Sequence, residues 1–153
     1  MVIKSLKSIY NRDLATLRTE IEAYNDESAI WKVDGGIANS AGNLCQHLIG
    51  NLKHFIGAEF GQSGYVRQRD LEFSTKGASR EELIKGIEET RAVVDATLDK
   101  LTPADLEADY PKPVFADMQT MTTGYFLIHL ATHLGYHLGQ INYHRRIFDN
   151  GSE

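Results

Sequence analysis

The sequence has little cysteine, little proline and no long apolar run. Its one cysteine, Cys45, cannot form a disulfide within the chain, so we expect a reducing, cytoplasmic location. Its three prolines, Pro103, Pro111 and Pro113, end one helical pattern and mark one connection. No apolar stretch approaches the roughly 18 residues that a membrane-spanning helix needs, so we expect a soluble protein that does not enter a membrane.

Basic residues are not in excess either. The formal net charge is −5 and the lysines and arginines are scattered, which argues against nucleic-acid binding. The first residues, MVIK, do not lead into a long apolar segment with a cleavage site, so we expect no secretory signal. Hydrophobic residues make up 42% of the chain and charged residues 24%, as in ordinary globular proteins. A length of 153 residues predicts a single domain over residues 1–153.

Apolar residues recur at spacings of three and four in four segments, the pattern of amphipathic helices. The segments run from Val2 to about Tyr24, from Ser40 to about Glu59, from Ser79 to Thr102 and from Thr120 to Phe148. Ser40 is a candidate N-cap, and the sequence Ser-Arg-Glu-Glu from Ser79 to Glu82 matches a capping box. No segment alternates convincingly as a strand would. The sequence therefore predicts an all-α four-helix bundle with long connections between helices.

The longest of these connections, residues 61–77, reads GQSGYVRQRDLEFSTKG and is predicted to be a loop because it is polar and interrupted by glycine. Long loops in compact domains are often functional. Its Tyr65, Arg67, Arg69 and Asp70 have two interpretations: they bind an anionic substrate, or they form an ordinary solvated surface.

Four of the six histidines fall in the last predicted helix, namely His129, His133, His137 and His144. The first three are spaced by four residues, so they form one ridge along a helix. A buried row of imidazoles needs a partner for each ring nitrogen, and neighbouring rings disfavour each other's protonation. A divalent metal ion satisfies both conditions, but one helix supplies only two ligands and a stable site needs three or four.

The second predicted helix offers the third ligand. His47 shares a face with Leu44, Leu48 and Asn51, which places it toward the core of the bundle. His54 lies seven residues later, about 10 Å along the helix axis, which is too far to reach the same ion.

The segments NLCQHLIGN and THLGYHLGQI resemble the DinB-like superfamily of four-helix-bundle metal-binding proteins. The resemblance extends over essentially the whole chain in the order of its helices. It implies that His47, His133 and His137 hold a divalent metal ion, with Gly139 and Gln140 as the residues that follow the last ligand. We expect this ion to be zinc or nickel. The alternative is that the three histidines form a polar network in the core.

The remaining candidates each have two interpretations. His129 either orients a neighbouring ligand or is an ordinary packed histidine, and Gln140 either bonds to a water on the ion or is an ordinary polar residue. His54 and His144 are predicted to be surface or hydrogen-bonded residues rather than ligands. Cys45, two residues from His47, points to the other side of its helix and is predicted to be a small buried residue.

Three imidazoles leave a position on the ion open, which is typical of catalytic zinc sites. The resemblance implies thiol-dependent transferases and isomerases, together with many proteins of no known activity. We therefore expect a metal-dependent hydrolase or thiol S-transferase acting on a small molecule or a low-molecular-weight thiol. The alternative is a non-catalytic metal-binding or stress-related bundle. Frequent tyrosines and phenylalanines in the first and last helices suggest a homodimer.

Overall fold

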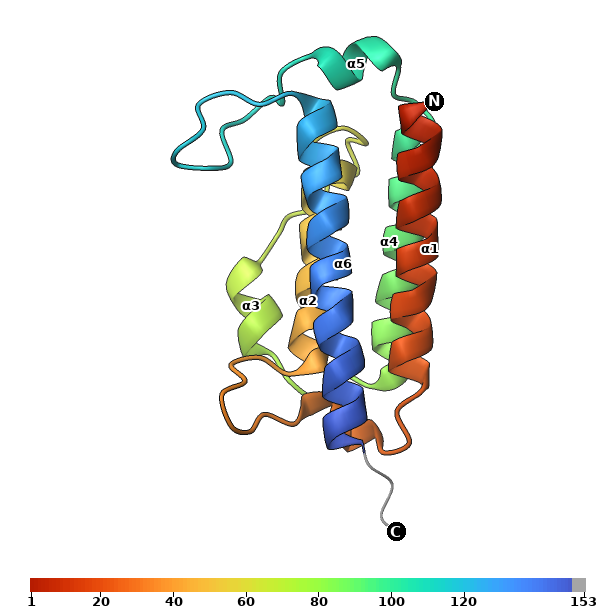
Figure 1. Cartoon of the computed structure of the whole chain (residues 1–153), viewed down its shortest axis with the longest axis vertical. Helices are drawn as coiled ribbons and strands as arrows, with labels where there is room; N and C mark the ends of the chain where they lie inside the picture. Colours follow the sequence, from red (N-terminus) through yellow and green to blue (C-terminus); the bar gives the residue numbers. More distant parts are fainter. Residues whose placement is uncertain (150–153) are drawn as a thin grey trace.

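Four long helices pack side by side in the computed structural model, which describes residues 1–149 (Figure 1). They are α1 (Val2–Glu22), α2 (Ala41–Leu52), α4 (Arg80–Leu98) and α6 (Thr123–Phe148). Four short elements lie between them: η1 (Glu27–Trp31), a 3₁₀ helix; η2 (Lys53–Ala58), a π-helical turn; α3 (Arg69–Ser74); and α5 (Pro103–Glu107). The predicted all-α four-helix bundle is confirmed.

Each long helix contacts two others around the bundle. Helix α1 packs against α4 and α6, and α2 packs against the same two helices from the opposite corner. Helices α1 and α6 run downward in Figure 1, whereas α2 and α4 run upward. The neighbours α2 and α6 are therefore antiparallel, and their contact line, the α2–α6 seam, carries the predicted ligands from both helices.

The predicted helix starts are confirmed by their caps. The Ser40 hydroxyl accepts a hydrogen bond from the backbone N–H of Asn43 at 3.1 Å. Ser79 and Glu82 form the predicted capping box, in which each side chain accepts a bond from the other's backbone N–H. Such caps satisfy N–H groups that have no partner within the helix, and each contributes about 1 kcal/mol.

The second predicted helix forms in two pieces. Helix α2 ends at Leu52, and the chain continues helically through the π turn η2, where the N–H of Glu59 bonds to the carbonyl of His54 at 3.2 Å. A π turn adds a residue to a helical turn and so rotates the side chains that follow it. Phe55, in this turn, lies against the face of α6 that carries Phe126, with ring centroids 5.1 Å apart.

A single cluster of buried apolar side chains fills the bundle. It draws on all four long helices, with fully buried members that include Leu14, Leu48, Ile87 and Leu134. Burying each such side chain contributes about 1.5–3 kcal/mol. The buried Tyr10 adds a directional contact: its hydroxyl donates to the carbonyl of Leu127 at 2.7 Å, which ties α1 to α6.

The prediction of a plain loop over residues 61–77 is wrong in part, because this segment contains α3. Helix α3 lies along α2, whose side chains hold the carbonyls at its C-terminal end. The side-chain amides of Asn43 and Gln46 each donate to the carbonyls of Glu72 and Thr75 at 2.9–3.2 Å. A helix this short is unstable alone, so contacts with another helix stabilise it.

The connection before the last helix also holds an unpredicted helix, α5. Pro103 occupies its first turn, and Thr102 and Asp105 form a capping box. These signals stand in the sequence, since proline is favoured in a first helical turn. Within residues 1–149, sheet-like pairing is limited to one bridge between Asp109 and Thr122, just ahead of α6.

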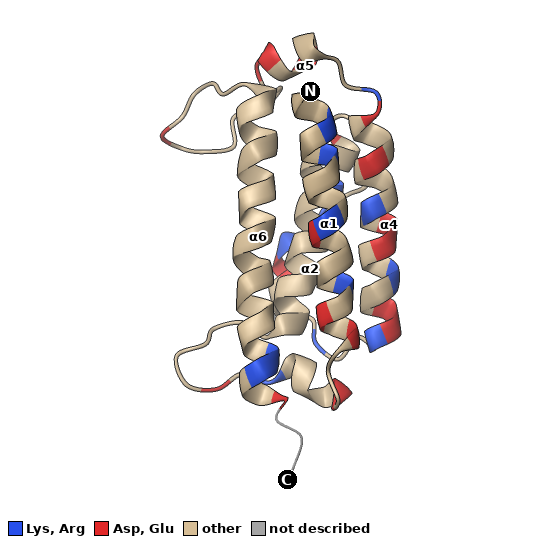
Figure 2. Cartoon of the chain, turned by 45° about the vertical axis from the view of Figure 1, so that its right-hand side comes forward, with Lys and Arg blue, Asp and Glu red and all other residues tan. Residues whose placement is uncertain are grey.

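Charged residues are unevenly distributed over the helices (Figure 2). Lysine, arginine, aspartate and glutamate follow α1 and α4, whereas α6 carries charge only at Arg145 and Arg146 in its last turn. Helix α2 has no charged residue. Charge near the α2–α6 seam therefore comes from the segment around α3. Of the helices described, none is both long enough and apolar enough to cross a membrane.

Candidate metal centre

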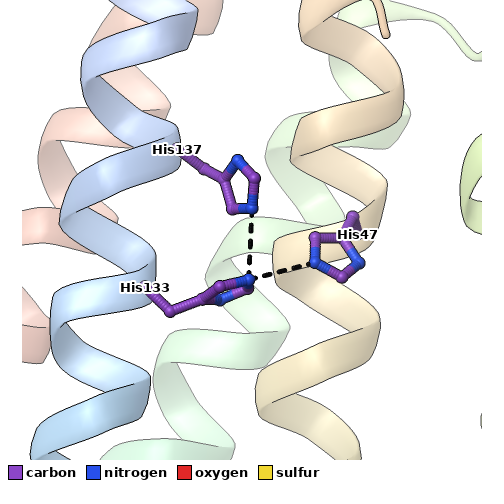
Figure 3. A group of neighbouring side chains, drawn as sticks. All are labelled: His47, His133 and His137. Carbon is purple, nitrogen blue, oxygen red and sulfur yellow. Dashed lines mark hydrogen bonds between the residues drawn. The ribbon is translucent and has the colours of Figure 1, made fainter. Parts of the chain in front are cut away.

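Three histidines meet across the α2–α6 seam. His47 comes from the middle of α2, and His133 and His137 come from successive turns of α6 (Figure 3). The Nε2 atom of His133 lies 3.2 Å from Nε2 of His47 and 3.1 Å from Nε2 of His137. The structure thus brings together the three predicted ligands, and within residues 1–149 they form a group whose geometry could hold a metal ion.

The spacing of these nitrogens fits a shared ion. Nitrogen ligands about 2.0–2.1 Å from a tetrahedral zinc ion stand about 3.3 Å from one another. The two measured separations, 3.1 and 3.2 Å, are close to that value. The ligand nitrogens of all three rings lie within 4.8 Å of one another.

The protons on the three rings point to the same conclusion. His47 Nδ1 lies 3.0 Å from a Glu72 oxygen and His137 Nδ1 lies 2.7 Å from Gln140 Oε1, so each of these Nδ1 atoms donates. In the neutral rings, both Nε2 atoms therefore present lone pairs to His133. Nε2 of His133 can donate only one proton, which leaves at least one pair of nitrogens facing each other without a hydrogen. A cation between the rings removes this conflict.

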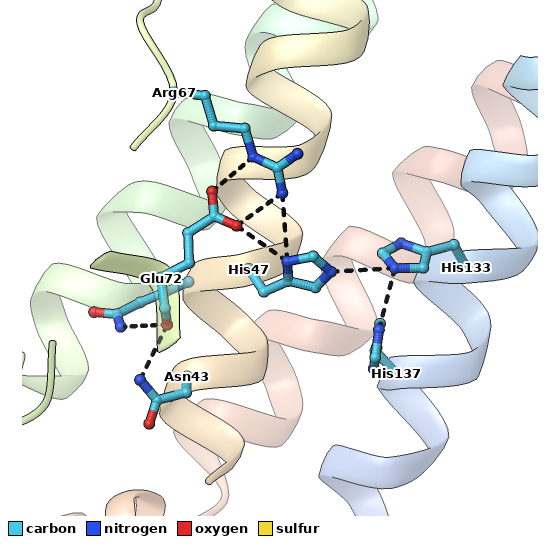
Figure 4. Close-up of polar contacts among 7 residues, drawn as sticks. Asn43, His47, Arg67, Glu72, His133 and His137 are labelled. Carbon is cyan, nitrogen blue, oxygen red and sulfur yellow. Dashed lines mark hydrogen bonds and ion pairs between the residues drawn. The ribbon is translucent and has the colours of Figure 1, made fainter. Parts of the chain in front are cut away.

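A buried carboxylate orients His47 (Figure 4). Glu72, on α3, is 6% exposed, and its Oε1 accepts the Nδ1 proton of His47. Arg67 donates to both oxygens of the same carboxylate at 2.8 Å, from Nε and from Nη2. Burial alone raises the pKa of Glu72, but the hydrogen bonds from Arg67 and His47 outweigh it and hold this pKa below its ordinary range. The carboxylate is therefore ionised and fixes which nitrogen of His47 faces the centre.

The sequence did not identify Glu72 as a functional residue, and it did not place Arg67 in a buried ion pair. The interpretation of residues 65–70 as a solvated surface does not hold for Arg67, whose side chain is 11% exposed and paired. One signal in α2 was available, namely Gly50. A Cβ atom at Gly50 would overlap Glu72 Oε2, so the absence of a side chain there lets the carboxylate reach His47.

The two ligands on α6 differ in their surroundings. Gln140, one turn after His137, bonds to its Nδ1 rather than reaching into the centre. The Nδ1 atom of His133 is buried and has no hydrogen-bond partner among the residues described. Burial, followed by the neighbouring rings of His137 and His47, lowers the pKa of His133 to about 4. This ring is therefore neutral near pH 7 and available as a ligand.

The other histidines lie outside the group. His129 packs its ring against Phe115, with centroids 4.9 Å apart, and stacks at 6.4 Å from His133. His144 is buried and hydrogen-bonded, to the Tyr24 hydroxyl at 2.7 Å and to the carbonyl of Lys32 at 2.9 Å. His54 is half-buried beside Phe55.

Cys45, on the same helix as His47, is fully buried. Burial raises the pKa of its thiol to about 12, so this side chain is inert, as predicted.

Two cavities flank the three histidines along the α2–α6 seam. The first, the arginine cavity, has a volume of about 380 Å³. It is lined by His47 and His133, by Asn51, Arg67 and Arg69, and by the rings of Phe55, Phe115, Phe126 and His129. The second, the tyrosine cavity, has a volume of about 420 Å³. It is lined by His137 and Gln140 together with Leu44, Tyr136, Tyr143 and the loop over residues 36–39. The arginine cavity is lined by the C-terminal part of α2 and the N-terminal part of α6, and the tyrosine cavity by the other ends of both helices. Because α2 and α6 are antiparallel, the two cavities lie on opposite sides of the centre.

Comparison with known families agrees with this geometry. Residues 9–141 match the sequence profile described as the DinB superfamily. The chain belongs to the DinB superfamily. The match includes α2, which carries His47, and the part of α6 that carries His133 and His137. The DinB-superfamily assignment therefore covers the candidate metal centre. No curated protein matches the chain closely enough to count as a relative.

Proposed function

We propose that this DinB-superfamily chain is a metal-dependent enzyme that holds Zn²⁺ or Ni²⁺ with His47, His133 and His137. The observation that carries the proposal is that three convergent Nε2 atoms stand between two cavities, each lined by at least one of the three rings. A site that only stabilised the bundle would need no open space beside its ligands, because structural zinc sites are closed.

The chemistry of the surroundings favours a thiol as the reacting group. A bound ion supplies Lewis acidity, which lowers the pKa of a thiol or a water that reaches it. Glu72 and Gln140 hold the rings of His47 and His137 with Nε2 toward the centre. The arginine cavity has no carboxylate among its lining residues, and the nearest buried one, Glu72, is fully engaged by Arg67 and His47.

A hydrolase commonly uses a carboxylate as general base, and no free one lines either cavity. A thiol needs less help, since its ordinary pKa is about 8.5 and the positive charge of Arg69 in the arginine cavity favours the thiolate. We therefore infer a thiol S-transferase acting on a small molecule, with hydrolysis as the second candidate.

Metal binding is tested first. Elemental analysis of protein purified without an affinity tag is expected to find about one divalent ion per chain. His133→Ala is expected to abolish most binding, whereas His54→Ala, which removes a histidine outside the group, should retain it. Protein that contains no metal and takes up neither Zn²⁺ nor Ni²⁺ on reconstitution would contradict the proposal.

The role of the thiol is tested by cobalt substitution. Co²⁺ in place of the native ion reports its ligands through its absorption spectrum, and a thiolate ligand adds an intense near-ultraviolet charge-transfer band. Titration with a low-molecular-weight thiol such as glutathione or cysteine is expected to produce this band. If the metal-loaded protein gives no such band with any small thiol, the transferase proposal fails. If, in addition, no small molecule alters the cobalt spectrum, the ion is structural.

A further inference from the structure

The lining of the arginine cavity combines two arginines with aromatic rings. Arg67 and Arg69 line it together with Phe55, Phe115 and Phe126, and the Arg67 guanidinium lies over the Phe55 ring at 5.6 Å. Its volume, about 380 Å³, is within the range of about 300–1,000 Å³ that small-molecule sites occupy.

Arg69 gives this cavity its net charge. The charge of Arg67 is neutralised by Glu72, whereas the guanidinium of Arg69 lies over the ring of Phe73 at 5.2 Å, and no carboxylate within residues 1–149 forms an ion pair with it. No aspartate or glutamate lines the cavity. An arginine on an aromatic face keeps its N–H donors free for a carboxylate.

Two residues that line the cavity carry buried polar atoms without partners. Asn51 is 6% exposed, lines the cavity, and its Oδ1 atom has no hydrogen-bond partner among the described residues. The Nδ1 atom of His133, another lining residue, is also buried without a partner. Buried polar atoms without partners cost about 1–3 kcal/mol each, so two of them on lining residues of one cavity favour a polar ligand or water bound beside them.

We propose that the arginine cavity binds a small carboxylate with a flat, unsaturated body. The carboxylate pairs with Arg69, and the body lies among the phenylalanine rings and reaches toward the histidines. This assignment rests on the proposed function, because it names the class of substrate that would meet the metal centre. The tyrosine cavity has no charged residue in its lining, so it offers an anion no comparable partner.

The proposal is tested with benzoate and its uncharged analogue benzamide, which share a flat ring and differ in charge. Binding is measured by calorimetry and by chemical-shift mapping, both in zinc-loaded protein and in protein kept metal-free with a chelator. A ligand this small is expected to bind with a Kd on the order of 1 mM. Benzoate is expected to bind about tenfold more tightly than benzamide, the difference of a charge-assisted hydrogen bond. The shifts are expected at Phe115 and Arg69.

Two matched variants identify the responsible arginine. Arg69→Gln removes the charge at the cavity and is expected to abolish the preference for benzoate. Arg146→Gln is the control, because Arg146 also lies over an aromatic ring, that of Tyr143 at 5.3 Å, and also pairs with no carboxylate in the described residues. Arg146 does not line the arginine cavity, so this variant should bind benzoate as the wild type does.

The metal-free measurement separates this proposal from the proposed function. A preference for benzoate that depends on Arg69 and persists in chelator supports the carboxylate site even if the chain proves to hold no metal. Equal binding of benzoate and benzamide overturns it. Binding of benzoate only to zinc-loaded protein, unchanged by Arg69→Gln, also overturns it, because the carboxylate would then be bound by the ion.

Discussion

Replacing Glu72 by glutamine tests how the fold supports the metal centre, because Glu72 contacts both Arg67 and His47. Glutamine keeps the size of the side chain but removes the charge that Arg67 and His47 share. Removing one partner of a buried ion pair costs about 3–5 kcal/mol. The Arg67 side chain keeps 11% exposure and a glutamine oxygen still accepts one of its bonds, so we expect the lower end, about 3 kcal/mol.

The loss is measured by thermal and denaturant unfolding in the presence of chelator. For a domain of this size about 3 kcal/mol corresponds to a decrease in Tm of roughly 6–12 °C. The second effect is on metal affinity, measured by competition with a chromophoric chelator. His47 loses the acceptor that fixes its Nδ1 proton, and loss of such a partner weakens metal binding about 10- to 100-fold.

A double-mutant cycle checks the reasoning. Arg67→Gln combined with Glu72→Gln removes the unpaired cation, so the double variant is expected to be more stable than Glu72→Gln alone. Glu89→Gln is the matched control, because Glu89 forms an exposed pair with Lys53 at 2.8 Å, and its loss should cost less than about 1 kcal/mol. Wild-type stability and wild-type zinc affinity in Glu72→Gln would refute the assigned role of the carboxylate.

Four further outcomes are expected. The pKa of His133 is about 4 in the folded state and about 6.5 in the unfolded state, so the unfolded chain binds more protons between these pH values. The metal-free protein should therefore lose stability as pH falls from about 6.5 toward 4. Unfolding curves recorded from pH 8 to 4 measure this loss. Zinc should raise Tm at pH 7 to 8 and progressively less toward pH 5, and coincident melts with zinc and with chelator over this range would show that the histidines hold no metal. Gly50→Ala should displace the Glu72 carboxylate and weaken zinc binding about tenfold while circular dichroism stays helical, which wild-type affinity would contradict. Light scattering is expected to show a homodimer, since Tyr125, Ile128 and Tyr136 expose an apolar face on α6. Tyr136→Lys should yield monomers. A wild-type protein that is monomeric at micromolar concentration would reject the dimer.

The sequence alone determined the features that depend on local geometry. Helical periodicity and the caps at Ser40 and Ser79 located the long helices within a few residues, because a side chain's position on a helix follows from its spacing. The same spacing placed His133 and His137 on one ridge. The inward face of α2 then left His47 as the histidine able to meet them, and the structure brings the three together.

The tertiary structure decided what surrounds these histidines. Glu72 stands 25 residues from His47 in a segment whose polar sequence predicts a loop. It forms part of a helix only because side chains of α2 hold the carbonyls of α3, and it reaches His47 only because Gly50 leaves room. Gly50 is visible in the sequence, but its role is not, since both conditions depend on the distance between two segments after the bundle has packed. The same holds for the arginine cavity, whose walls come from α2, η2, the segment around α3, the connection before α6, and α6 itself. Periodicity fixes the face on which a side chain lies, whereas packing of distant segments fixes the groups that it meets.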